Sequence, residues 1–285
     1  MLRQLAADVF VETGYESGNV GVIRTERGGL LVDTPMLPRD ARDWREKLFD
    51  LDVDEIYAIV NTDYHPEHFI GNAFFMPTRI WGHEQSAKPI SKYKTSTLEQ
   101  LSATYREGDP VLADEIAQIE IYEPELEVGD RATLYLGGDQ IQVLYLEGHT
   151  PASLGVYLPK DKILFAGDNV VNNEHPTLAD ANSLAWIETL ERIREMDAEV
   201  IVPGSGEPTG KEAVARLEEY IREMRDRVAE LYQNGASRRE CVEKVGMLDF
   251  YPVPEDHVSR VKRRRRESIE RVYAEIRTAH PRSRR

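Results

Sequence analysis

Short apolar runs bounded by turn-forming residues recur along the chain as far as Val202, and they predict β-strands. The first three form an antiparallel meander around the turn Glu26-Arg27-Gly28-Gly29. Two further pairs have the spacing of β-hairpins. The strands are expected at 9–11, 19–25, 30–34, 56–60, 79–82, 132–136, 141–146, 154–158, 163–166 and 199–202.

Helical spacing of apolar residues alternates with these strands. Residues 40–51 form an amphipathic pattern, and Asn182-Ser183 is expected to cap a helix that ends near Met196. Residues 84–120 are helical and polar, with breaks at two prolines. From residue 211 the pattern is helical, with breaks at 234–235 and 252–254.

Two strand-rich blocks, each followed by helices, predict an α+β fold in which two mixed sheets form a sandwich with helices outside. We assign residues 1–210 to this domain and residues 211–285 to a C-terminal helical extension packed on it.

The composition narrows the class of protein. The chain has 285 residues, ample for a large core, and Cys241 is its only cysteine, so an intrachain disulfide is impossible. No apolar run approaches the roughly 20 residues of a membrane span, and the first residues do not form a signal sequence. We therefore expect a cytoplasmic protein with no membrane partner.

Charge is unevenly distributed. The net charge is −15, yet residues 211–285 carry +5 and the remainder −20. The acidic body argues against nucleic acid as a partner. The basic run Lys262–Arg266 is interpreted as a solvated helix face or a salt-bridged contact with that body. A homodimer contact through the C-terminal helices is a further prediction.

The candidate chemistry is concentrated in one loop. Asp63, His65, Glu67 and His68 follow the buried strand 56–60 within six residues. Because a loop does not force neighbouring side chains onto opposite faces, all four can converge. Two imidazoles and two carboxylates suit zinc, iron or manganese. The alternative is a polar loop whose histidines only form hydrogen bonds.

Other candidate loops also follow predicted strands, and in this order they resemble the metallo-β-lactamase superfamily over about residues 8–210. Leu31-Val32-Asp33-Thr34 resembles the end of the family's opening meander. The Asp63–His68 loop stands where the family has His-x-His-x-Asp-His. Gly148-His149-Thr150-Pro151, Gly167-Asp168 and Pro203-Gly204-Ser205-Gly206 resemble the family's later ligand loops.

The resemblance implies an αββα sandwich and one or two divalent metal ions, zinc first and manganese or iron as alternatives. One ion would be held by Asp63, His65 and His149. The other would be held by Glu67 and His68, with Asp168 between the two ions. This chain departs from the family at three positions, with Asp63 and Ser205 in place of histidines and Glu67 in place of aspartate. The loss at Ser205 predicts a weaker second site, unless Glu207 replaces the missing ligand.

The implied reaction is hydrolysis of a small ester, thioester, lactone or amide-type substrate by metal-activated water. Asp168 would bridge the metals or orient the hydroxide, and Glu67 would act as general base if it is not a ligand. His175 would orient the substrate or donate a proton, or it is a structural residue. Two alternatives remain open, a site with a single metal and a metal-poor, inactive member of the fold that serves as a binding or scaffold protein.

Overall fold

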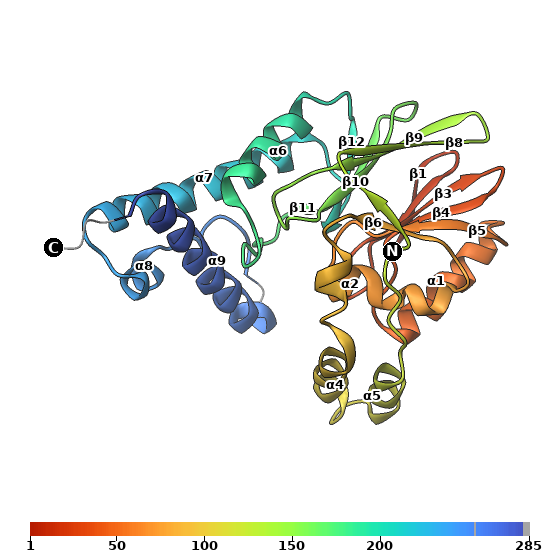
Figure 1. Ribbon diagram of the computed structural model, residues 1–285, viewed down its shortest axis with the longest axis horizontal. Helices are drawn as coiled ribbons and strands as arrows, with labels where there is room; N and C mark the ends of the chain where they lie inside the picture. The colour runs from red at the N-terminus through yellow and green to blue at the C-terminus, as the bar shows by residue number, and fades with distance from the viewer. Residues whose placement is uncertain (254, 282–285) are drawn as a thin grey trace.

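The structure, a computed structural model, describes residues 1–253 and 255–281. Its first half forms a mixed sheet of seven strands, most of which are labelled in Figure 1. The strands lie in sequence order, antiparallel up to β4 and parallel from β4 to β7. Their bounds are β1 Leu2–Ala6, β2 Val9–Glu12, β3 Val20–Thr25, β4 Gly28–Val32, β5 Ile56–Val60, β6 Ile80–His83 and β7 Leu126–Val128.

The predicted meander is confirmed, but the two edge strands β1 and β7 escaped the sequence analysis. Both are short, and β1 has only exposed and half-buried residues, so neither has the apolar run that identifies a buried strand.

The second sheet has five strands in the order β12-β11-β10-β9-β8. Both predicted hairpins are present as the pairs β8–β9 and β10–β11, and β12 lies parallel to β11. The bounds are β8 Arg131–Leu136, β9 Asp139–Tyr145, β10 Leu154–Leu158, β11 Ile163–Val171 and β12 Val200–Ser205.

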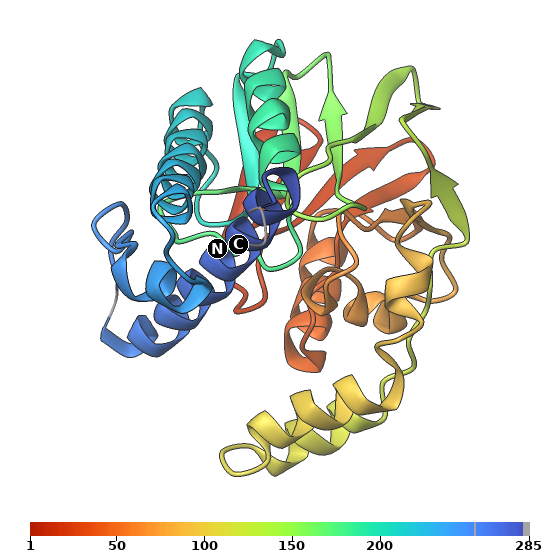
Figure 2. The ribbon, with the colours of Figure 1, turned by 60° about the vertical axis from the view of Figure 1, so that its left-hand side comes forward.

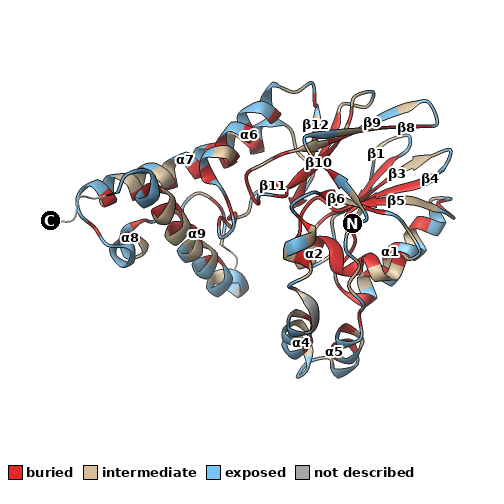
Figure 3. Ribbon diagram, viewed as in Figure 1, coloured by how far each residue is buried: buried red, intermediate tan, exposed pale blue. Residues whose placement is uncertain are grey.

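Alternating residues of the central strands belong to different hydrophobic cores. In β4, Leu30 and Val32 pack between the two sheets, whereas Leu31 packs beneath a helix on the outer face. In β11, Phe165 lies between the sheets and Leu164 lies on the opposite outer face. Strands buried on both faces explain the continuous apolar runs of the sequence (Figure 3). The predicted αββα sandwich is confirmed.

Helices of the first half cover the outer face of the first sheet and extend away from it. The helix α1 packs on that face through Ala41, Trp44 and Leu48. The segment 84–120 contains a hairpin of α4 and α5 that projects from the body (Figures 1 and 2). The bounds are α1 Pro38–Asp50, α2 Pro66–Phe69, the 3-10 helix η1 Ile70–Phe75, α3 Ala87–Ile90, α4 Lys94–Tyr105 and α5 Pro110–Ala117.

Of the remaining helices, α6 and α7 pack on the second sheet, and α8 and α9 pack on α7 beyond it (Figure 1). Asn182 caps α6 as predicted, with its side chain accepting a hydrogen bond from the Ala185 backbone. The bounds are α6 Ser183–Glu195, α7 Lys211–Gln233, α8 Arg238–Lys244, the 3-10 helix η2 Glu255–His257 and α9 Val258–Ala279. Breaks after 233 and around 252 agree with the sequence, although Pro254 lies outside the described residues.

The C-terminal helices share a core with the second sheet. One continuous cluster joins Leu164 of β11 and Trp186 of α6 to Ile221 of α7 and Val272 of α9. The division of the chain at residue 210 stays a prediction. Within the described residues, no helix is long and apolar enough to cross a membrane.

Candidate metal centre

The candidate residues meet where the two sheets bring the ends of their strands together. Asp33 directly follows β4, and Asp63 lies three residues beyond the end of β5. Asp168 lies within β11, beside β12. Gly204 of β12 is required there, because a Cβ at that position would overlap Oδ1 of Asp168. Two groups of possible metal ligands result.

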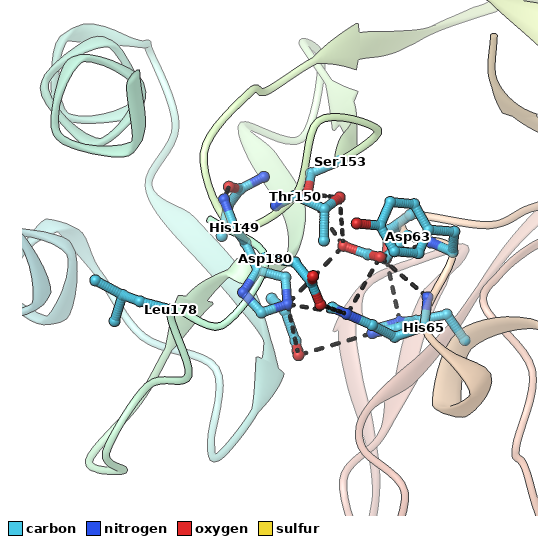
Figure 4. A network of polar contacts seen from close by, with 12 residues as sticks. Asp63, His65, His149, Thr150, Ser153, Leu178 and Asp180 are labelled. Atoms are coloured by element: carbon cyan, nitrogen blue, oxygen red, sulfur yellow. Dashed lines mark hydrogen bonds and ion pairs between the residues drawn. The ribbon is translucent and has the colours of Figure 1, made fainter. Parts of the chain in front are cut away.

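The first ligand group consists of Asp63, His65 and His149 (Figure 4). Nδ1 of His65 lies 3.2 Å from Nε2 of His149 and 3.3 Å from Oδ1 of Asp63. Four ligands placed tetrahedrally at about 2.0–2.1 Å from zinc have donor atoms about 3.3 Å apart. The spacing of the first ligand group is therefore that of ligands around one ion.

The Asp63 carboxylate is held by hydrogen bonds on both oxygens. Oδ1 accepts from the backbone N–H groups of Tyr64 and His65, at 2.6 and 3.0 Å. Oδ2 accepts from the hydroxyls of Thr150 and Ser153, at 3.1 and 3.0 Å. These donors come from two loops, so the carboxylate also ties the loops together.

Asp180 orients the imidazole of His65. Its Oδ2 lies 3.1 Å from Nε2 of His65 (Figure 4). An imidazole that donates from Nε2 leaves the Nδ1 lone pair directed at the first ligand group, and such outer carboxylates are typical of histidine metal ligands. Nothing in the sequence singled out Asp180, which lies 115 residues from His65 along the chain.

The second ligand group consists of Glu67, His68 and Asp168. Asp33 accepts from Nδ1 of His68 at 2.9 Å, which directs Nε2 towards Asp168, 3.8 Å away. Oδ2 of Asp168 also lies 3.6 Å from Nε2 of His149, so this carboxylate stands between the two groups. Asp33 was noted in the sequence only as part of the opening meander.

The charges of the centre favour a cation. Burial alone would lower the pKa of His65, but the charge of Asp63 and the hydrogen bond with Asp180 raise it to about 9. Burial also opposes charge on His68, yet neighbouring carboxylates raise its pKa well above the usual value. Burial lowers the pKa of His149. Carboxylates therefore dominate the potential at the centre.

One orphaned atom tests whether a metal fits. Nε2 of His68 is buried and has no hydrogen-bond partner among the described residues. A buried, unpaired polar atom costs free energy, and this one is directed at Asp168 and Glu67. A divalent ion bound by the second ligand group would satisfy it, so the residues fit the metal that the donor types indicate.

A cavity of about 690 Å³ opens beside the second ligand group, and both Glu67 and Asp168 line it. Ser205 and Glu207 also line the cavity. Glu207 belongs to neither ligand group, and its Oε2 forms an ion pair with Nη2 of Arg3 at 2.6 Å. The replacement of the missing ligand by Glu207 stays a prediction.

His175 lines the same cavity, but its ring nitrogens have protein partners. Nδ1 lies 3.4 Å from the hydroxyl of Tyr220, and Nε2 lies 3.2 Å from the carbonyl oxygen of Tyr251. These contacts favour the structural alternative, and a catalytic role for His175 stays a prediction.

Comparison with known proteins decides the family. The sequence model described as "Metallo-beta-lactamase superfamily" matches residues 13–205. The chain belongs to the metallo-β-lactamase superfamily. The match includes both ligand groups and ends at Ser205, so α7, α8 and α9 lie beyond it.

Curated relatives in this superfamily are named hydrolases. The chain is 24% identical to a linear primary-alkylsulfatase of a Pseudomonas strain over 79% of this chain, but it spans only 49% of that protein. It is 27% identical to the type 2 metallo-β-lactamase of Bacteroides fragilis, over 73% of this chain and 76% of the relative. The predicted class, a metallo-hydrolase of this superfamily, is confirmed at the level of the family.

A solved structure shows the same fold over nearly the whole chain. The crystal structure of a metallo-β-lactamase family protein from Thermus thermophilus superposes with a TM-score of 0.70 at 19% identity. The superposition covers 97% of this chain and 95% of that protein. At this identity the likeness concerns the fold alone.

Proposed function

We propose that this member of the metallo-β-lactamase superfamily hydrolyses a small ester, thioester, lactone or amide-type substrate with metal-activated water. One observation carries the proposal. Glu67 and Asp168 belong to the second ligand group and also line the cavity, so a water activated there would face a bound substrate. Zinc suits the mixture of imidazoles and carboxylates, and manganese or iron suits its carboxylate content.

A divalent ion held by these groups would lower the pKa of a coordinated water from about 15.7 towards about 7 and polarise the oxygen of the bond under attack. The protein contributes position and proton transfer. Asp168, between His68 and His149, is placed to orient the water. Glu67 is half-buried in the cavity wall. If it is not itself a ligand, its carboxylate can accept the proton of the attacking water there.

The proposed hydrolysis adds one water molecule across the bond that is cleaved. For an ester, the water oxygen bonds to the carbonyl carbon and the carbon–oxygen bond to the leaving group breaks. Glu67 as general base accepts one proton from the water and returns it to the alcohol leaving group as that group departs. The products are a carboxylic acid and an alcohol.

The first experiment measures metal content. Protein purified without added metal, then titrated separately with Zn(II), Mn(II) and Fe(II), is expected to bind one or two equivalents. Each loaded form is then assayed with chromogenic ester, thioester, lactone, lactam and phosphodiester substrates. Metal uptake with turnover of one class supports the proposal. Stable metal binding without turnover of any class contradicts it.

The second candidate is a metal-poor member of the fold that acts as a binding or scaffold protein. The three departures at Asp63, Glu67 and Ser205 favour it, because affinity falls when ligand type and geometry no longer match. Metal below about 0.2 equivalents, with no uptake on titration, would establish this candidate. Occupancy near one equivalent would instead indicate a site with a single metal.

The homodimer and the cytoplasmic location remain predictions from the sequence. A sedimentation mass near 32.6 kDa at micromolar concentration would contradict the homodimer.

A further inference from the structure

The basic run Lys262–Arg266 lies on α9, and its members do not share one environment. Lys262 and Arg263 are exposed to solvent. Arg265 donates to the carbonyl oxygens of Val242 and Val245, which fastens α9 to the end of α8. Arg264 instead lines the cavity beside the candidate metal centre, and its side chain is only 24% exposed.

We propose that Arg264, with Arg260 one helical turn earlier, binds an anionic group of the substrate next to the metal centre. This inference rests on the proposed hydrolase function and specifies its substrate as a small ester that carries a negative charge. Both arginines line the cavity that Glu67 and Asp168 also line. The shared cavity places positive charge within reach of any molecule bound at the second ligand group.

Most of the hydrogen-bonding capacity of Arg264 is unused by the protein. A guanidinium has five N–H donors. Nη1 of Arg264 lies 3.3 Å from the carbonyl oxygen of His175, the only hydrogen bond of its guanidinium among the described residues. Among the described side chains the nearest carboxylate oxygen, Oε2 of Glu174, is 3.8 Å away, too far for a hydrogen bond. A structural tie to His175 therefore accounts for one donor and leaves the others for a ligand.

The electrostatic surroundings of Arg264 favour an anion once the metal is bound. Burial lowers the pKa of Arg264, and the charge of Arg260 lowers it further, while Asp168 and Glu67 oppose this. Those two acids belong to the second ligand group, so a bound cation would offset their charge. The remaining neighbour, Glu174, is 44% exposed, and an ion pair of that kind is weak.

The chemistry of arginine limits the class of ligand that can bind here. Its planar fork forms paired hydrogen bonds with the oxygens of sulfate, sulfonate, phosphate or carboxylate groups. Burial strengthens such a contact because less water screens it. The rest of the protein repels anions, since residues 1–210 carry a net charge of −20. Because the family match ends at residue 205, the C-terminal helix α9 would supply this specificity.

Binding is tested with 1-hexanesulfonate, which resembles an alkyl sulfate but has no ester bond to cleave. Calorimetric titrations use metal-loaded wild type, Arg264→Met, Arg264→Lys and the matched control Arg263→Met, whose arginine lies on the same helix outside the cavity. We expect Arg264→Met to weaken binding about 10- to 100-fold, as for hydrogen bonds to charged groups. Arg264→Lys should recover part of the loss, and Arg263→Met should change nothing. Equal affinity in Arg264→Met and wild type would overturn the proposal.

Turnover measurements distinguish failure of the anion-site proposal from failure of the hydrolase proposal. For the wild type and both methionine variants, kcat/KM is compared between 4-nitrophenyl acetate, which is neutral, and its anionic counterparts, 4-nitrophenyl sulfate and the 4-nitrophenyl half-ester of glutaric acid. Arg264→Met should lower kcat/KM about 10- to 100-fold for an anionic ester and leave acetate within about twofold. Equal losses of kcat/KM on charged and neutral esters would show that Arg264 has only a structural role and would overturn the inference. If no ester is cleaved while hexanesulfonate still binds through Arg264, the hydrolase proposal fails and the anion site remains.

Discussion

The two ligand groups of the centre are built differently, although they share one loop. In the first, the Asp63 carboxylate accepts four hydrogen bonds, and Asp180 holds the ring of His65. In the second, Asp33 holds His68, but the half-buried Glu67 stands in the cavity wall, and the strand β12 contributes Ser205 where the family has a histidine.

The difference separates two requirements of a catalytic metal site. Ligands that are locked before the metal arrives lose little conformational freedom on binding and so give high affinity. A reacting water needs an open side, which the second ligand group has at the cavity. We infer that the first group binds its ion more tightly and the second faces the substrate. Four substitutions test this inference.

The largest effect is expected from Asp63→Ala. It removes a ligand of the first group and leaves the buried hydroxyls of Thr150 and Ser153, which lie 2.9 Å apart, with one acceptor fewer between them. We expect the free energy of unfolding to fall by about 3 kcal/mol and the first metal equivalent to bind at least about 100-fold more weakly. Thermal unfolding and metal titration measure both.

Asp63→Asn is the matched control, because it keeps the size of the side chain and an acceptor oxygen. It should recover much of the stability but not the metal affinity. Unchanged affinity in both variants would show that Asp63 serves only as a structural tie between loops.

Glu67→Gln should weaken metal binding at the second ligand group. Because the side chain is half-buried and has no hydrogen bond or ion pair among the described residues, stability should stay within about 0.5 kcal/mol. The second equivalent should bind about 10- to 100-fold more weakly. A titration that resolves two binding steps measures the shift. A loss confined to the first step would reverse the comparison of the two groups.

Asp180→Asn should weaken binding of the first metal equivalent about tenfold, since the amide still holds the His65 ring but no longer supplies a negative charge. The Asp180 side chain is 54% exposed, so the fold should tolerate the change. Asp50→Asn, at an exposed position at the end of α1, is the control for lost surface charge. Equal effects of the two variants would exclude an orienting role for Asp180.

The smallest expected effect is a gain in metal affinity. Ser205→His returns an imidazole to the cavity wall beside Asp168 and should tighten the second equivalent by several-fold, up to about tenfold. The first equivalent should not change. If the affinity for the second metal equivalent does not rise, the weak metal binding of the second ligand group has a cause other than the missing histidine.

The candidate residues that the sequence singled out lie next to strong local signals, and the structure brings them together. Asp63, His65 and His68 follow a buried apolar strand, and His149 and Asp168 stand in loops that resemble those of the family. The residues that support them have no such signal. Asp180 is an acid in an ordinary loop, and Arg264 is one of five consecutive basic residues, of which periodicity alone does not select the inward one.

Short apolar runs bounded by turn-forming residues determined all strands except β1 and β7, and with them the sandwich, because the pattern that identifies a buried strand lies in neighbouring residues. Residue type likewise determined that the loop after β5 could bind a metal. Only the tertiary structure decided which carboxylates orient the donor histidines and which side of the centre is open. It also decided that α9, more than 80 residues beyond Asp168 along the chain, presents an arginine to the same cavity. Those choices depend on contacts between distant segments, and a contact of that kind leaves no local pattern in the sequence.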